Sequence, residues 1–126
     1  MSKAFLMILL AIISSSAMAQ WVEIGKSENF IVYVDPTTIR KSGNIVKIWS
    51  LHDYKMAQGS IPYMSSRLER EHDCIEKWGR QLFLAFYDKN MGRGGSIWKD
   101  AETRNWLPVA SGTIKETVWK YACGKG

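Results

Sequence analysis

Residues 30–56 read FIVYVDPTTIRKSGNIVKIWSLHDYKM, and this stretch decides the fold. In Phe30–Asp35 successive side chains alternate between two apolar sets, and this period of two predicts a β-strand. The Ser-Gly-Asn sequence at 42–44 is typical of a turn. A second and longer strand, Ile45–Met56, is expected directly after it. The stretch therefore predicts two successive strands of a β-sheet.

Pro36 lies inside this stretch and is expected to interrupt it. Proline has no amide hydrogen to donate and fixes its own φ, so the Asp-Pro-Thr-Thr sequence at 35–38 should end the first strand. The residues that follow, Thr37–Lys41, would then form one helical turn before the turn at 42–44.

Four further strands are expected on either side of residues 30–56. Turn residues separate them, and they cover Trp21–Ser27, Met64–Cys74, Trp78–Asp88 and Ser96–Asp100. A glycine-rich loop, Asn90–Gly95, lies between the last two. Because the strands follow one another without helices between them, antiparallel pairing is favoured.

Two of these strands indicate which side chains face the core. In Met64–Cys74 the odd positions are polar or charged, so they are expected to face water while Cys74 points inward. In Trp78–Asp88 one face carries Leu82, Leu84 and Phe86, and the other carries Phe83, Ala85 and Tyr87. This second apolar face suits either a ligand or the interface of a homodimer.

The C-terminal region changes to a helical period. Apolar side chains recur there at helical spacing, at Ile114, Val118 and either Tyr121 or Ala122. Thr113 and Glu116 fit a capping box, and Gly124 fits the left-handed residue after a helix. Since the strands precede this helix, the sequence predicts an α+β fold. An antiparallel sheet of about six strands carries one C-terminal helix.

The first nineteen residues have the three parts of a secretory signal peptide. Lys3 gives a positive head, residues 4–13 are an unbroken apolar run, and Ala17-Met18-Ala19 is a small-x-small cleavage site. The apolar run is about half as long as a membrane helix requires. We therefore expect a signal peptide over residues 1–19, export, and no transmembrane segment after cleavage.

After cleavage, residues 20–126 have the length of one domain. Cys74 and Cys123 are its two cysteines, and an oxidising compartment favours their pairing. The closed loop would contribute about 4 kcal/mol to stability by chain entropy. A redox pair or a metal site would need closer spacing or nearby ligands. We therefore expect one structural disulfide that clamps the end of the helix to the sheet.

Charge gives little information about partners. The net charge is +5 with the signal peptide, but positive and negative side chains are interspersed along the chain. Such a pattern is typical of a solvated surface and provides no basic stripe for nucleic acid. Together with export, it argues against nucleic acid as a partner. The six tryptophans are expected mostly to pack in the core or on a sheet face.

Catalytic motifs are absent from the sequence. Gly92-Arg93-Gly94-Gly95 lacks the Gly-Lys-Ser/Thr ending of a phosphate loop, and no Gly-x-Ser-x-Gly or His-Glu-x-x-His sequence occurs. No pair of carboxylates is placed for acid–base catalysis. We therefore expect no enzyme activity, no catalytic residues and no cofactor.

The two histidines, His52 and His72, are each followed by an aspartate. If the connection between their strands centres on Pro62, His52 lies opposite His72, and the pair becomes a candidate for zinc. Each histidine and its aspartate, however, point to opposite faces of a strand. Surface or half-buried histidines without a metal are therefore the expectation.

An ordered set of short segments runs through the mature chain. They read WVEIG (21–25), YVDPTTIR (33–40), VKIW (46–49), DYK (53–55), EHDC (71–74), NMG (90–92), WLPV (106–109), SGT (111–113) and WKYAC (119–123). Together with Glu116 and both cysteines, the set resembles the bacterial surface-adhesin protein E family. The resemblance covers essentially the whole mature chain.

This resemblance implies a non-enzymatic envelope protein of a Gram-negative bacterium, located in the periplasm or at the cell surface. It also implies a protein partner from the host extracellular matrix or serum. In the family the binding stretch is basic and surrounds the first cysteine. By position it falls on residues 67–80, whose basic side chains are Arg67, Arg70, Lys77 and Arg80. The alternative is a periplasmic module that binds a small ligand or inhibits an enzyme.

Overall fold

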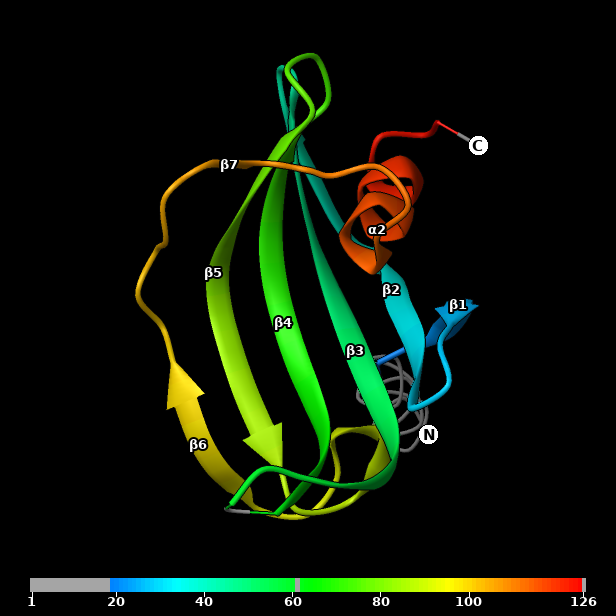
Figure 1. Cartoon of the computed structure of the whole chain (residues 1–126). Helices are drawn as coiled ribbons and strands as arrows, with labels where there is room; N and C mark the ends of the chain where they lie inside the picture. The colour runs from blue at the N-terminus through cyan, green and yellow to red at the C-terminus, as the bar shows by residue number, and fades with distance from the viewer. Residues whose placement is uncertain (1–18, 61, 126) are drawn as a thin grey trace, which may run out of the picture.

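A computed structural model of the chain describes residues 19–60 and 62–125. Its elements are β1 (Val22–Lys26), β2 (Phe30–Ser42), β3 (Ile45–Gln58), β4 (Tyr63–Asp73), β5 (Trp78–Tyr87), η2 (Asn90–Gly92), β6 (Ser96–Asp100), β7 (Leu107–Pro108) and α2 (Ile114–Ala122) (Figure 1). The predicted signal peptide, residues 1–19, lies outside the described residues except for Ala19. In the part described, no helix has the length and apolar character needed to cross a membrane.

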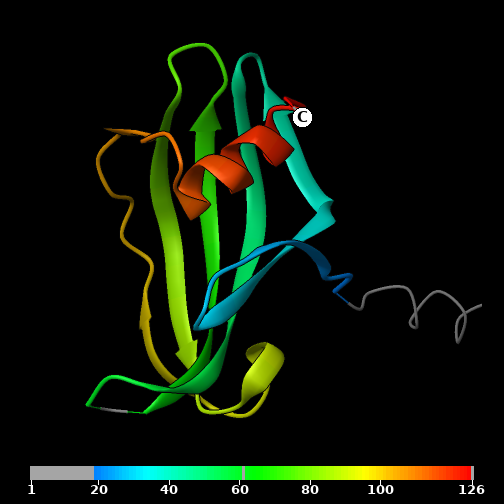
Figure 2. The ribbon, with the colours of Figure 1, turned by 45° about the vertical axis from the view of Figure 1, so that its right-hand side comes forward.

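The strands form one antiparallel sheet in which neighbours in the chain are also neighbours in space. Their order is β1-β2-β3-β4-β5-β6, and β7 pairs with the start of β5. The central strands, β2 to β5, have 10 to 14 residues each. The α2 helix crosses one face of this sheet (Figure 2). The predicted architecture of about six antiparallel strands with a C-terminal helix is therefore confirmed, in a chain that is mostly β.

The hydrophobic core lies between α2 and the face of the sheet that α2 covers, which we call the helix-side face. Its buried members are Val32, Val34, Val46, Ile48, Val118 and Ala122. They come from β2, β3 and α2. The alternation in β2 and the helical spacing in α2 are as the sequence predicts. We call the opposite side of the sheet the outer face.

The helix is capped and anchored at both of its ends. The Thr113 hydroxyl accepts a hydrogen bond from the Glu116 amide, as the capping box predicts. At the other end, Cys123 forms the predicted disulfide with Cys74, with 5.5 Å between their Cα atoms. The Trp119 indole nitrogen donates to the carbonyl oxygen before Cys74 at 2.9 Å. A covalent bond and a hydrogen bond therefore hold the helix to the end of β4.

The prediction that Pro36 ends a strand is wrong. β2 continues through Pro36, and its pairing with β3 shifts after Asp35. The Thr38 hydroxyl donates to the Asp35 carbonyl oxygen at 2.7 Å and accepts from the Trp49 amide at 3.0 Å. The residues expected as a helical turn, Thr37–Lys41, therefore belong to β2. Its bulge lies between Asp35 and Arg40, and Arg40 and Lys41 pair with Lys47 and Val46.

The register of β3 against β4 also differs from the expectation. His52 lies opposite Ser66 and not opposite His72. The last pair before the turn is Gln58 with Tyr63, so the hairpin centres before Pro62, and a bulge in β3 after Asp53 shifts the register further. The hairpin centred on Pro62 therefore does not form. His72 is only 1% exposed, so it is more deeply buried than expected. In residues 19–60 and 62–125, no group of three or more His, Cys, Asp or Glu side chains could hold a metal ion.

The odd positions of β4 do not all face water as expected. Ser65 is fully buried because η2 folds over this part of the outer face. Its hydroxyl donates to the Lys89 carbonyl oxygen at 2.6 Å and accepts from the Gly92 amide at 2.8 Å. The Met91 amide donates to the Asp53 carboxylate at 2.7 Å. The outer face is thus covered at one end and open beyond it.

Candidate functional site

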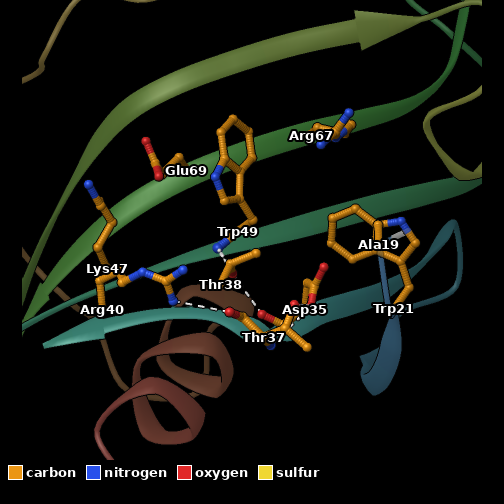
Figure 3. A pocket seen from close by; sticks show the side chains of 10 residues that line it. All are labelled: Ala19, Trp21, Asp35, Thr37, Thr38, Arg40, Lys47, Trp49, Arg67 and Glu69. Carbon is orange, nitrogen blue, oxygen red and sulfur yellow. Dashed lines mark hydrogen bonds between the residues drawn. The ribbon is translucent and has the colours of Figure 1, made fainter. Parts of the chain in front are cut away.

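The open part of the outer face carries a groove of about 500 Å³, which we call the outer groove (Figure 3). Its residues come from the segment before β1, from the β2 bulge, and from facing parts of β3 and β4. They are Ala19, Trp21, Asp35, Thr37, Thr38, Arg40, Lys47, Trp49, Arg67 and Glu69.

The β2 bulge forms one wall of this groove. The Asp35 carboxylate is almost fully buried and accepts hydrogen bonds from the Thr37 amide at 3.0 Å and the Thr37 hydroxyl at 2.6 Å. The Arg40 guanidinium donates to the Thr37 carbonyl oxygen at 3.1 Å. The bulge therefore gathers hydroxyl groups and a cation at one edge of the groove.

Arg67 and two tryptophans form the centre of the groove. The Arg67 guanidinium lies 5.3 Å from the centroid of the Trp49 ring and 5.8 Å from that of Trp21. The Trp49 ring also lies 5.3 Å from the Phe83 ring on β5. Cation–π contacts of this kind hold a guanidinium in place without using its hydrogen-bond donors. The Arg67 Nε is buried and has no hydrogen-bond partner within the described chain.

The second apolar face expected on β5 is part of this surface. Phe83, Ala85 and Tyr87 lie opposite Glu69, Arg67 and Ser65 respectively, so they face outward. Ala85 is 1% exposed, and Phe83 contacts Trp49. Phe83 therefore supports Trp49 of the groove, and Ala85 is too deeply buried to contribute to a contact surface.

Positive charge predominates at the groove. Its cationic side chains are Arg40, Lys47 and Arg67, and its carboxylates are Asp35 and Glu69. Because the Asp35 carboxylate is buried and hydrogen-bonded internally, the part that a partner would meet carries more positive than negative charge.

The structure does not bring the four basic residues of 67–80 together. Arg67 lines the outer groove, and Arg70 points to the helix-side face. Lys77 lies in the turn between β4 and β5, and Arg80 lies on β5. Only Arg67 belongs to the outer groove, so these four cations do not form one patch.

Two of these cations already have carboxylate partners. Lys77 lies 2.5 Å from the Glu116 carboxylate of α2, and the hydrogen bond from Lys77 is the main reason that the pKa of Glu116 is lowered to about 2. Arg80 lies 2.8 Å from the Glu71 carboxylate, with its guanidinium over the Trp106 ring. These pairs connect elements of the fold to one another.

Sequence reasoning missed most of the outer groove. The alternation within β3 already places Lys47 and Trp49 on the same face, so this signal was available. Arg40 and Trp21 could not be placed in this way. Their positions depend on the β2 bulge and on the path of the chain before β1, which strand periodicity does not report.

Solved structures of Haemophilus influenzae protein E are similar to this chain. One matches with a TM-score of 0.65 at 17% identity, covering 86% of this chain and 87% of that chain. Crystal form II of the same protein matches with a TM-score of 0.61 at 16% identity, covering 86% and 97%. Protein E from a non-typeable strain matches at 0.58 and 16% identity, covering 87% and 79%. At identities this low, the matches show a shared fold and nothing more.

No protein with a curated description matches the chain significantly. The family model for surface-adhesin protein E, however, matches residues 21–124. This range contains every strand described above, the α2 helix and both cysteines. The chain therefore belongs to the surface-adhesin protein E family.

Proposed function

We propose that this protein is an exported, non-enzymatic envelope protein that binds another protein through the outer groove. The observation that carries the proposal is Arg67 held between Trp21 and Trp49, with Arg40 and Lys47 beside it. Membership of an adhesin family favours a binding role over a catalytic one. The outer groove then supplies the contact surface.

The composition of the groove suits a protein partner. Tryptophan and arginine are enriched at the centres of protein interfaces, where they contribute much of the binding energy. The Arg67 guanidinium is oriented by its ring contacts, so binding costs little of its side-chain entropy. The excess of cations favours a partner segment that carries Asp or Glu.

We further propose that the partner is a host extracellular-matrix or serum protein, as the family resemblance implies. Of the four basic residues in 67–80, Arg67 makes the central contact. Arg80 lies opposite Glu71 on the same outer face and would extend the contact along the sheet. Arg70 and Lys77 contribute no direct contact in this proposal.

A binding measurement with a charge-reversed groove tests this proposal. Purified protein from residue 20 onward is passed over immobilised vitronectin and laminin, and the Kd is determined at two salt concentrations. The double variant Arg40→Glu/Lys47→Glu is expected to weaken binding at least tenfold, because both substitutions place a negative charge in the groove. The wild-type Kd should also rise with salt.

The matched control is Lys55→Glu/Lys99→Glu. It changes the net charge by the same amount, and its two side chains are exposed and lie outside the groove. The control is expected to bind like the wild type. Equal loss in both double variants would show that net charge alone drives binding. No wild-type binding to either protein at micromolar concentration would remove the host-protein proposal.

The proposed export is tested separately. Cell fractionation with protease accessibility should find the protein in the periplasm or at the surface, and mass spectrometry should find its first residue to be Gln20. An unprocessed chain in the cytoplasm would contradict export.

A further inference from the structure

The helix-side face carries a second cavity, of about 440 Å³, between the sheet and the first turn of α2. We call it the helix-side cavity. Its floor is formed by β3, β4 and β5, and its rim by the segment from β7 to α2. This cavity lies on the opposite side of the sheet from the outer groove, so it is not explained by the proposed protein contact.

Arg70 is the charged group on the floor of this cavity. No hydrogen bond or ion pair of its side chain exists within the described chain, and its Nε is buried without a partner. Burial lowers the pKa of Arg70. Arg70 is half-buried, and a partly buried charge is stabilised by a counter-ion. The guanidinium is therefore available to an anion that enters the cavity.

The neighbours of Arg70 make space for its guanidinium and do not neutralise its charge. Gly79 on β5 has no side chain, and a Cβ there would come within 2.8 Å of the guanidinium. His52 also lines the cavity, and burial, followed by the charge of Arg70, lowers its pKa to about 4. At neutral pH His52 is thus uncharged. Ser50 and Gln81 supply further hydrogen-bonding groups to the floor.

The rest of the cavity is mainly apolar. Leu68 lies on the floor, and Pro108, Ile114 and Val118 form the wall toward the helix. A ligand here would therefore meet an apolar lining with two cations, Arg70 on the floor and the exposed Lys115 at the rim. A volume of about 440 Å³ falls within the range of small-molecule sites.

A row of aromatic rings begins at His52, which lines the cavity, and continues along the helix-side face of the sheet. The His52 ring stacks on Phe30 with 5.1 Å between centroids. The row then passes through Tyr54 to Tyr63 and Phe86, whose rings are stacked 4.0 Å apart. An apolar chain that leaves the cavity could therefore lie along this row.

We propose that the helix-side cavity binds a single-chain amphipathic carboxylate, with its carboxylate on Arg70 and its acyl chain against Leu68, Ile114 and the aromatic row. The carboxylate matches the guanidinium in charge and in hydrogen-bond geometry. The acyl chain removes apolar surface of the cavity from water. Ligand binding here is independent of the protein contact on the outer face.

Isothermal titration calorimetry with three probes tests the proposal on the oxidised chain from residue 20 onward. Decanoate has both the charge and the chain, decanol lacks the charge, and acetate lacks the chain. Decanoate is expected to bind at least tenfold more tightly than either of the others at pH 7. Equal affinity for decanol would overturn the role of Arg70, and no binding of decanoate at millimolar concentration would overturn the site.

Substitutions test which side chains bind the decanoate carboxylate. Arg70→Met should weaken decanoate binding at least tenfold, because it keeps the volume and removes the cation. It should also melt no lower than the wild type, since an unpaired and partly buried charge is lost. Arg93→Met is the matched control: its side chain is exposed and lies outside the cavity, and it should bind decanoate like the wild type. Equal decanoate affinity of Arg70→Met and Arg93→Met would overturn the proposal.

A second variant keeps the test decisive if Arg70→Met does not fold. Ala110→Trp changes an exposed residue of the rim and leaves Arg70 in place. The larger side chain is expected to block the cavity and weaken decanoate binding at least tenfold. Unchanged decanoate affinity in this variant would place the ligand elsewhere.

Discussion

The backbone nitrogen of Gln20 donates a hydrogen bond of 3.1 Å to the Asp35 carboxylate. Asp35 is 3% exposed and is also bonded to Thr37 in the β2 bulge. If the signal peptide is removed after Ala19, this nitrogen becomes the terminal ammonium group. The hydrogen bond would then become an ion pair that fixes the start of the mature chain to the edge of the outer groove.

Removal of the signal peptide is therefore expected to increase the contribution of Asp35 to the free energy of unfolding. In a chain that begins at Gln20, Asp35→Asn should lower the free energy of unfolding by about 1 kcal/mol more than in a chain that retains Met18 and Ala19. The reason is that only the first chain loses a charged pair. Urea denaturation of the wild type and of Asp35→Asn, each in the short and the long form, measures the difference. The same loss in the long and the short chain would contradict the ion pair.

Thr38 is expected to be essential for the β2 bulge. Its hydroxyl donates to the Asp35 carbonyl oxygen and accepts from the Trp49 amide, so Thr38→Val leaves both groups without this partner. The expected loss is about 1–3 kcal/mol in the free energy of unfolding, measured by urea denaturation. Thr103→Val is the control, because Thr103 is exposed in an irregular segment and should change stability by under about 0.5 kcal/mol. A similar effect of both variants would argue against the role of the hydroxyl.

The Cys74–Cys123 bond is expected to be a major stabilising element. It closes a separation of 49 residues, for which chain entropy gives about 4 kcal/mol. The double variant Cys74→Ala/Cys123→Ala should therefore unfold at much lower urea concentration than the oxidised wild type. Reductant should lower the midpoint of the wild type and leave that of the variant unchanged. A reductant effect on the variant would point to another cause.

His72 is expected to make stability depend on pH. Burial, followed by the charge of Arg70, lowers the pKa of the folded-state imidazole to about 4, whereas in the unfolded chain it is about 6.5. Between these values the unfolded chain binds a proton that the folded chain does not. The free energy of unfolding therefore falls as the pH falls through this window.

His72→Leu should reduce this loss between pH 7 and pH 4 by about 3 kcal/mol. Urea denaturation at several pH values measures it. His52 has a pKa lowered to about 4 for the same reasons, so the variant keeps part of the dependence. The double variant His52→Leu/His72→Leu should remove most of the remaining pH dependence of the free energy of unfolding. An unchanged pH profile in the double variant would assign the effect to the carboxylates.

The sequence predicts the regular elements well and their irregularities poorly. The sixth strand, Ser96–Asp100, and the cap of α2 at Thr113 were predicted as they occur. Both depend on local patterns: the period of side chains and the chemistry of a helix end. The bulges after Asp35 and Asp53 were not predicted, because each depends on a hydrogen bond or an extra residue that periodicity does not report.

The candidate sites were less predictable for the same reason. The family resemblance implies a single basic stretch over residues 67–80, but alternation in β4 sends Arg67 and Arg70 to opposite faces. Ion pairs with Glu116 and Glu71 occupy Lys77 and Arg80. The residues that surround Arg67 come from four separate parts of the chain, so the groove appears only after the bulges set the register.

Both borders of the sheet are interrupted. Beyond Val34 the side of β2 that β1 leaves free contains the bulge after Asp35. β1 has five residues and a bulge, and the free side of the longer β5 is divided between five residues of β6 and two of β7. A long, flat border with free backbone groups invites a second copy to add on, which leads to fibrils. Because the borders are interrupted in this way, the fold is expected to resist the edge-to-edge addition of further copies.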